Sequence, residues 1–359
     1  MNLQEAVQVE IERGLSDLNA RAKVCQDIVL KSIALGGLNR NITVKGGVVM
    51  RAKTGNIRRA TQDLDIDFIR YSLSDDSIDD FIAKMNTLQG VSVKRTGKIE
   101  ELKQQDYKGK RVYVEISDDS GFKIKSKIDF GVHNKLDIAQ EEYCFDIAFD
   151  ESGANLLINS NEQMLVEKLR SLLKFGNNST RFKDVFDIFY LSQHVELLKL
   201  RRCMDAYIIG DVQMPENSGQ DVLNRIRRIF SNKNYLKQMD ESGKNWLDVP
   251  VNEVVEGILD FFEDDVFRII QPLNENYSFD AEIAKKQEDL KTTQKTTQKT
   301  TQKILDTIMN NPNVTRSELS EICGITADGV KWQLKNLTKS GRISRIGGDR
   351  GGHWEVHDK

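Results

Sequence analysis

The stretch Leu64-Asp65-Ile66-Asp67-Phe68 constrains the fold most, because apolar and acidic residues alternate along it. This alternation predicts a strand whose apolar side chains lie in a core. Asp63, Asp65 and Asp67 then share the opposite face, where like charges at this spacing repel one another. A divalent cation removes that repulsion, because Mg²⁺ prefers carboxylate oxygens and is commonly held by one or two carboxylates with substrate phosphates. The stretch therefore predicts a metal-binding strand, although it assigns no role to Asp67.

Two glycines precede this strand, in Val44-Lys45-Gly46-Gly47. The apolar run Val48-Val49-Met50 after them is suited to open a helix. Glycine lets a backbone approach a phosphate closely, and the N-terminus of a helix offers free N–H groups to an anion. A phosphate cradle next to an acidic, metal-binding strand indicates nucleotide chemistry.

The order Lys45-Gly46-Gly47, then Arg59-Ala60-Thr61-Gln62-Asp63-Leu64-Asp65, resembles the AbiEii/AbiGii-type toxins of the nucleotidyltransferase superfamily. The resemblance implies an α+β fold, with a nucleotidyltransferase-type mixed sheet flanked by helices. It also implies which residues of the two motifs bind the nucleotide: Lys45, Gly46, Gly47, Arg59 and Thr61.

A later segment, residues 122–130, predicts a strand with Asp129 on its polar face among three lysines. Superfamily members commonly place a third carboxylate on such a strand. The resemblance therefore implies that Asp129 joins Asp63 and Asp65 as a metal ligand. The residues alone leave open a solvated surface carboxylate at this position. The lysines are either solvated or form a surface for substrate phosphates.

Apolar residues at helical spacing predict amphipathic helices over residues 162–173 and 181–191. Both segments resemble the remaining motifs of the toxin family, a Glu-Lys-Leu helix and an Arg-x-Lys-Asp-x-x-Asp helix. The resemblance implies that Lys168 contacts the nucleotide phosphates. It also implies that Asp184 and Asp187, on one helix face, orient Lys168 or contact the acceptor substrate. The alternative for each charge is an ion pair on a helix surface.

The composition is that of an ordinary folded protein, with 359 residues, 39% hydrophobic residues and a net charge of −3. The charge is uneven, because residues 291–359 carry 12 Lys and Arg against 7 Asp and Glu. The four cysteines lie far apart without a Cys-x-x-Cys motif, which argues against zinc and disulfides. No apolar run approaches the roughly 18 residues of a membrane helix, and no signal peptide is recognisable. We therefore expect a cytoplasmic protein with no membrane partner.

Changes in pattern along the chain predict four parts. Residues 1–197 form the nucleotidyltransferase domain, and residues 198–290 form a helical extension. Residues 291–302 repeat Lys-Thr-Thr-Gln without an apolar residue, which predicts a polar linker because such a segment has no face to bury. Residues 303–359 form the fourth part.

The fourth part resembles a winged helix-turn-helix domain, with three short helices followed by a glycine-rich hairpin. Thr315-Arg316-Ser317-Glu318 is a capping box that opens the second helix. In this fold the third helix enters the major groove and the wing meets the backbone. The resemblance therefore implies contacts with DNA or RNA from five side chains: Lys331, Lys335, Arg342, Arg345 and Arg350. Winged helices also dock onto proteins, so that alternative stays open.

Together these features predict a metal-dependent nucleotidyltransferase that uses Mg²⁺ or Mn²⁺ and a nucleoside triphosphate (NTP). By resemblance it is the toxin of a toxin–antitoxin or phage-defence pair, with an RNA acceptor, for which tRNA is one candidate, and a separately encoded antitoxin. The implied catalytic group is Asp63, Asp65, Asp129, Lys168 and Asp187. Two alternatives remain, a DNA-binding regulator with a degenerate nucleotidyltransferase fold and a nucleotidyltransferase that modifies protein.

Overall fold

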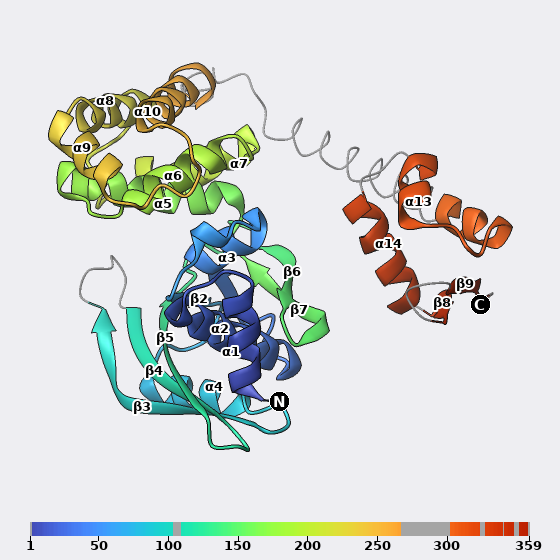
Figure 1. Ribbon diagram of the computed structural model, residues 1–359. Coiled ribbons are helices and arrows are strands. Elements are labelled where there is room, and N and C mark those ends of the chain that lie inside the picture. Colours follow the sequence, from blue (N-terminus) through green and yellow to red (C-terminus); the bar gives the residue numbers. More distant parts are fainter. Residues whose placement is uncertain are drawn as a thin grey trace. The chain divides into compact units, whose positions relative to one another are not determined.

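The computed structural model describes residues 2–102, 109–266, 302–323, 327–339, 341–347 and 352–357. The chain divides into two compact units, Met1–Gln271 and Pro272–Lys359, each with its own hydrophobic core. In the first unit a mixed sheet is flanked by helices (Figure 1), which confirms the predicted α+β fold. The predicted boundaries at residues 197 and 290 stay predictions.

The sheet of the first unit has seven strands in the order β3-β4-β5-β2-β1-β7-β6. Their bounds are β1 Ile42–Lys45, β2 Leu64–Phe68, β3 Val91–Leu102, β4 Gly109–Asp118, β5 Lys123–Val132, β6 Glu141–Ile147 and β7 Asp150–Ile158. The acidic strand β2 lies in the middle, antiparallel to β1 and parallel to β5. A central strand has a neighbour on each side, so its side chains meet those of two other strands on each face.

The helices of the first unit fall into two groups. The N-terminal group is α1 Leu3–Glu12, α2 Asp17–Leu35, α3 Gly46–Thr54, the 3₁₀ turn η1 Ile57–Arg59 and α4 Asp75–Lys84. The C-terminal group is α5 Asn161–Phe175, the 3₁₀ turn η2 Gly176–Asn178, α6 Phe182–Ser192, α7 Leu197–Met204, the π-helix η3 Asp205–Ile209, α8 Gly219–Phe230, α9 Lys233–Glu241, α10 Val251–Asp260 and the π-helix η4 Phe261–Val266. Figure 1 shows α5 to α10 stacked together above the strands.

The two faces of β2 are used as the alternation predicts. Leu64, Ile66 and Phe68 are buried, with exposed fractions of 1%, 0% and 0%. The Phe68 ring lies 5.0 Å from the ring of Phe81 on α4 and 5.1 Å from that of Phe130 on β5. Helix α2 packs against β5, β6 and β7, and α4 packs against β3. The apolar face of the sheet is thereby closed, and its acidic face is left for the site.

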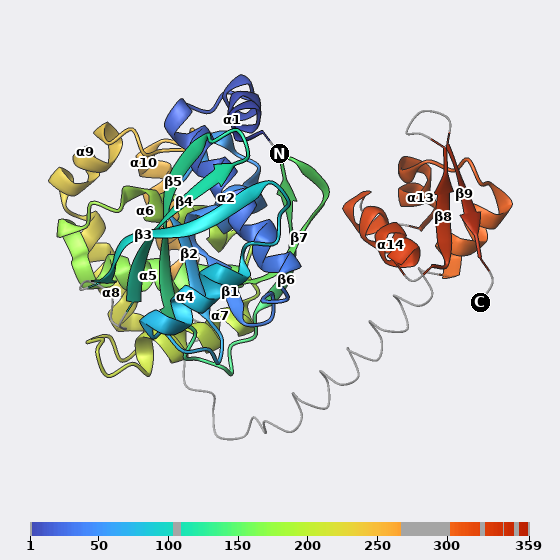
Figure 2. The ribbon, with the colours of Figure 1, turned by 90° about the horizontal axis from the view of Figure 1, so that it is seen from below.

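The second unit has the predicted sequence of elements. Residues 302–310 are helical, followed by α13 Arg316–Cys323, α14 Ala327–Lys339, β8 Ile343–Ile346 and β9 His353–Val356. Figure 2 shows β8 and β9 side by side next to α13 and α14. The capping box is confirmed, because Glu318 Oε2 accepts from the Thr315 N–H at 2.7 Å and the Glu318 N–H donates to Thr315 Oγ1 at 3.3 Å. Arg350, predicted to contact nucleic acid from the wing, lies outside the described residues.

Candidate functional site

Strand register brings the predicted carboxylates together. Asp65 lies opposite Asp129 of the parallel strand β5 and opposite Lys45 of the antiparallel strand β1. Residues that face each other in register on adjacent strands point to the same side of the sheet. Asp65 and Asp129 therefore project from the same face. The two predicted carboxylates thus lie on adjacent strands and on one face of the sheet.

The glycine pair lets the start of α3 lie directly against this strand. Gly46 has a φ of +68°, a conformation that favours glycine, and a Cβ there would collide with the carboxylate of Asp65. A Cβ on Gly47 would lie only 2.8 Å from the side chain of Thr61. Both glycines are therefore needed for close approach. The free N–H groups at the N-terminus of α3 begin next to the acidic face.

Most carboxylates of the acidic face are paired with cations. Asp129 makes a two-pronged ion pair with Arg111 of β4, with both N–O distances at 2.7 Å. Asp63 lies 2.7 Å from the Nζ of Lys127, and Asp67 lies 2.8 Å from the Nζ of Lys45.

The carboxylate of Asp65, in contrast, has no ion pair and no hydrogen bond to any residue that the structure describes. Its pKa is raised to about 6. Burial is the largest cause, and the nearby charges of Asp129 and Asp63 also raise the pKa, against the lowering effect of Lys45. Ionisation of Asp65 is thus unfavourable, because the carboxylate is buried and, among the described residues, no cation makes an ion pair with it.

Whether this site suits a divalent cation is decided by its donor atoms. Within the described part of the chain, no three His, Cys, Asp or Glu side chains surround a common metal position. Asp63 and Asp65 nevertheless offer hard oxygen donors, and Mg²⁺ is usually held by one or two carboxylates plus substrate phosphates. A cation beside Asp65 would oppose the effects of burial and of the Asp129 and Asp63 charges, which together raise its pKa. The residues therefore fit a metal ion whose remaining ligands come from the substrate. Without the metal, Lys127 neutralises Asp63 and Arg111 neutralises Asp129.

Lys168 of α5 faces this group from the helical stack. Its Nζ lies 2.8 Å from Asp184 Oδ1 and 2.8 Å from Asp187 Oδ2, both on α6. Asp187 is fully buried, and it also accepts from Arg59 at 2.7 and 2.6 Å and from the indole of Trp246 at 3.0 Å. Burial alone would lower the pKa of Lys168, but the two carboxylates raise it above its ordinary value. The alternative of surface ion pairs is therefore wrong for these residues, which form a buried network.

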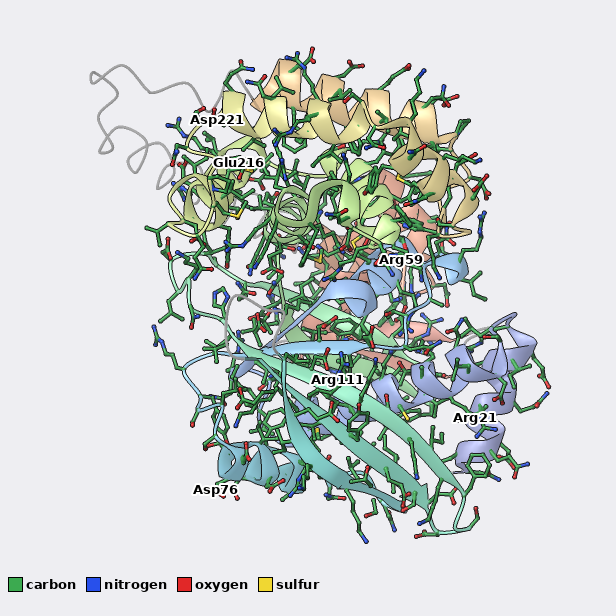
Figure 3. The ribbon with its side chains drawn as sticks, turned by 90° about the vertical axis from the view of Figure 1, so that its left-hand side faces the viewer. Arg21, Arg59, Asp76, Arg111, Glu216 and Asp221 are labelled. Atoms are coloured by element: carbon green, nitrogen blue, oxygen red, sulfur yellow. The ribbon has the colours of Figure 1, made fainter. Side chains whose placement is uncertain are left out.

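That network separates the roles of its members. Asp184 lines open space, whereas Asp187 is enclosed and its oxygens are occupied by donors. In Figure 3, Arg59 lies where the helical stack meets the N-terminal helices, and Arg111 lies on the strands of the sheet. The geometry gives Asp187 a positioning role toward Lys168 and Arg59. Its predicted place in the catalytic group stays a prediction.

Two chambers adjoin the acidic face and share part of their lining. The residues common to both are Gly46, Asp65, Lys168, Arg181 and Asp184. The wider chamber has a volume of about 670 Å³ and is rich in cationic side chains, namely Arg58, Arg59, Lys127, Lys183 and Lys244. The narrower chamber, of about 380 Å³, is bounded by the far end of β2, by α5 and by η3. Two reactants thus have room on two sides of one charged group.

Comparison with known proteins identifies the first unit. Residues 28–250 match the family described as "Nucleotidyl transferase AbiEii toxin, Type IV TA system". The chain belongs to this AbiEii family. The matched range contains every predicted residue of the nucleotide site. Arg59, Thr61 and Asp63 lie between α3 and β2, and the others lie on β1, α3, β2, β5, α5 and α6. The predicted resemblance to this family is confirmed.

Three further comparisons concern the second unit, the solved structures and the curated proteins. Residues 297–344 match a family described as "Winged helix-turn-helix DNA-binding", which confirms the predicted class of the second unit. Among solved structures, the AbiEii-family chain is similar to an antigenic nucleotidyltransferase-like protein from Paracoccidioides brasiliensis. The identity is 13% and the TM-score 0.34, over 59% of this chain and 91% of that one. No curated protein matches the sequence.

The winged-helix unit presents most of its predicted contacts. Lys331 and Lys335 are exposed on α14, and Arg342 is exposed where the wing begins. Arg345 is exposed as well, but its guanidinium lies 5.0 Å from the centre of the Trp354 ring. In the part of the chain that the structure describes, no helix is long and apolar enough to cross a membrane.

Several residues of the site carried no prediction from the sequence. Arg111 neutralises Asp129 and Tyr207 lines the narrower chamber, yet neither residue belongs to a motif. Arg111 is revealed only by the register that sets it opposite Asp129. Lys127 had a partial signal, because it alternates with apolar residues on the strand of Asp129.

Proposed function

We propose that this AbiEii-family protein transfers a nucleoside monophosphate from an NTP to a hydroxyl group of RNA, in a reaction that depends on Mg²⁺ or Mn²⁺. The observation that carries the proposal is that Asp65 lies beside both Asp129 and Gly46, while Asp65, Gly46 and Lys168 line both chambers. This combination provides for phosphate, metal and hydroxyl within one space.

Each residue has a defined task in this reaction. The N-terminus of α3 at Gly46 and Gly47 and the ammonium of Lys168 hold the phosphates. Asp63 and Asp65, assisted by Asp129, hold the metal, which when bound neutralises phosphate charge and lowers the pKa of the acceptor hydroxyl. The hydroxyl gives up its proton to water and its oxygen attacks the α-phosphorus. The bond from that phosphorus to the oxygen that bridges the α- and β-phosphates breaks, and pyrophosphate leaves.

The two chambers suit a reaction between two substrates. Cationic side chains line the wider chamber, and such side chains attract the phosphates of a polynucleotide. This favours RNA as the acceptor, with tRNA as one candidate. The family description names a toxin of a type IV toxin–antitoxin system. We therefore propose that the chain acts as such a toxin, with phage defence as its setting and a separately encoded antitoxin as its partner.

The test is transfer of label from each of four α-³²P-labelled NTPs, with Mg²⁺, in the presence of total RNA or total protein. We expect label in RNA and its loss in the variant Asp65→Asn, because an amide replaces the carboxylate that would hold the metal. Asp76→Asn is the matched control, since Asp76 is an exposed residue of α4 (Figure 3) outside both chambers. It should label RNA as the wild type does.

Other results would redirect the proposal. Label in protein instead of RNA would favour the protein-modifying alternative. Absence of label with every NTP, with Mg²⁺ and with Mn²⁺, would favour the degenerate, DNA-binding alternative. Label that survives in Asp65→Asn would remove the site from the chemistry.

The winged-helix unit is proposed to bind DNA or RNA through its third helix. The double variant Lys331→Ala/Lys335→Ala should weaken binding of a DNA duplex about tenfold or more, because each lysine that contacts a phosphate releases a counterion. The slope of log affinity against log salt should fall by about one for each lysine that no longer meets a phosphate. Fluorescence anisotropy at several salt concentrations measures both. Lys237→Ala, an exposed lysine of the first unit, should change neither. Unchanged binding in the double variant would favour the protein-docking alternative.

A further inference from the structure

The narrower chamber has the size and walls of a site for a nucleobase. Its volume of about 380 Å³ lies within the usual range for small-ligand pockets. Most of the side chains that line it are polar or charged, and Val132, Met164, Phe175 and Tyr207 are the apolar and aromatic ones. Nucleobases bind proteins by stacking on aromatic rings and by hydrogen bonds from one polar edge. Both kinds of partner are present here.

Tyr207 is held in place by an unusual backbone. It lies within the π-helix η3, and π-helical turns occur frequently at functional sites. The guanidinium of Arg170 donates to the Tyr207 carbonyl oxygen at 2.8 Å, which fixes this turn against α5. Burial, followed by the charge of Glu167, raises the pKa of the Tyr207 hydroxyl, so the ring remains neutral. Phe175, at the end of α5, is 38% exposed and lines the same chamber. The chamber thus has a fixed aromatic wall and a second ring open to solvent.

Asp67 supplies the polar edge. It lines the chamber, is only 3% exposed, and its Oδ2 lies 2.8 Å from the Nζ of Lys45. Its other oxygen, Oδ1, has no hydrogen-bond partner among the residues that the structure describes. A buried carboxylate oxygen without a donor is costly, and native structures usually reserve such an atom for a ligand or water. The donor that completes Asp67 is therefore expected from the occupant of the chamber.

We propose that the narrower chamber binds a nucleobase that carries an exocyclic amino group, with the amino group donating to Asp67 Oδ1 and the ring against Tyr207. A carboxylate accepts well from such an amino group, as Asp and Glu do from cytosine N4. Uracil has a carbonyl oxygen at that position, which would face the carboxylate without a shared proton. Cytosine, adenine and guanine are therefore accepted, and uracil is disfavoured.

This inference rests on the proposed nucleotidyl transfer and names the base chemistry that the same site selects. The base can come from either reactant, the NTP or the 3′-terminal nucleotide of the acceptor. To distinguish these two sources of the base, we compare pairs of nucleotides that differ in whether the base carries the amino group. In one arm, CTP is compared with UTP and GTP with ITP on a fixed RNA acceptor. In the other arm, one NTP is used with oligonucleotides that end in cytidine, uridine, guanosine or inosine.

The full-length wild type should show a preference of about tenfold or more in kcat/KM for the amino-bearing member in one of these arms. Asp67→Asn should abolish or invert that preference in the same arm. Its amide oxygen still accepts from Lys45, so its NH₂ group takes the position of Oδ1 and favours a carbonyl oxygen. Tyr207→Ala should raise KM in that arm, with Tyr207→Phe close to wild type, because the ring and not the hydroxyl makes the contact.

Controls separate this inference from the function on which it rests. Asp76→Asn should keep the wild-type preference, and a thermal melt should show that Asp67→Asn is folded. Transfer with equal kcat/KM for both members of every pair, in both arms, would overturn the base-selecting chamber and leave nucleotidyl transfer standing. A preference that Asp67→Asn retains would overturn it as well. Absence of transfer from all four NTPs would instead overturn the proposed function, and with it this inference.

Discussion

Asp65→Asn is expected to abolish nucleotidyl transfer and, at pH 7, to make the protein more stable. Burial and the charges of Asp129 and Asp63 raise the pKa of Asp65 from 3.8 to about 6. A raised carboxyl pKa means that the folded protein resists ionisation of this group. Above both pKa values that resistance destabilises the fold by at most about 3 kcal/mol. An amide of the same shape removes the charge and hence the penalty, so we expect a gain of about 1–3 kcal/mol.

The sign of the pH dependence distinguishes this mechanism from ordinary repacking. Between about pH 4 and pH 6 the folded state holds the Asp65 proton and the unfolded state has lost it. Because the unfolded state binds fewer protons, this group lowers the stability as pH rises through that window. The gain from Asp65→Asn should therefore be full above about pH 6 and vanish near pH 4.

Thermal melts and urea titrations of the metal-free protein across that range measure this difference. Asp76→Asn, whose carboxylate is exposed, should give no comparable gain at either end. Added Mg²⁺ should shrink the gain at pH 7, because a cation opposes the same unfavourable ionisation in the wild type. Equal or lower stability of Asp65→Asn at pH 7 would contradict the unfavourable ionisation inferred for Asp65.

The parts of the fold that follow from local pattern were accessible from the sequence. Strict alternation predicted β2 and its two faces, because a period of two has meaning only for a strand with one buried side. Thr315 and Glu318 predicted the start of α13 through a hydrogen-bond exchange between neighbours in sequence. In both cases the determining contacts are made within a few residues. Such features can be derived without knowing the tertiary structure.

Features that depend on register or on distant partners were not accessible. Strands β1, β6 and β7 were not predicted, because β1 has four residues, all buried, and its pairing with β7 joins segments far apart in sequence. The partner of Asp129 is Arg111 of β4. The register between β4 and β5 places the two residues opposite each other. Charge alone gave no reason to prefer that arginine. The site therefore holds more cations than its motifs indicate.

The burial of α6 shows a second limit. Asp184 and Asp187 lie on one helix face, and composition alone favours such charges on a surface. The structure instead packs α6 between α5 and α10, which closes over Asp187. The resemblance to the family indicated that these charges matter, but only the packing shows that Asp187 contacts Arg59, Lys168 and Trp246 together.

Asp187→Ala is consequently expected to be among the most destabilising substitutions in the first unit. Burial alone would raise the pKa of Asp187, but Lys168 and Arg59 outweigh it and hold the pKa below its ordinary value. Removing the carboxylate leaves the buried guanidinium of Arg59 without the carboxylate that it contacts, and leaves Lys168 with Asp184 alone. Loss of one member of a buried ion network typically costs about 3–5 kcal/mol. We expect a loss of this size in urea titrations near pH 7, where the native carboxylate is ionised.

The neighbouring carboxylate on the same helix face provides the matched comparison. Asp184→Ala leaves Lys168 paired with Asp187 and faces a chamber that water can enter, so its loss of stability should be clearly smaller. Asp187→Asn should fall between the two, because an amide oxygen still accepts one hydrogen bond while the charge is gone. If Asp184→Ala and Asp187→Ala lost nearly equal stability, the buried network would contribute no more to stability than an ion pair on the surface. The enclosure of Asp187 would then have little energetic consequence, and its positioning of Lys168 would lose its physical basis.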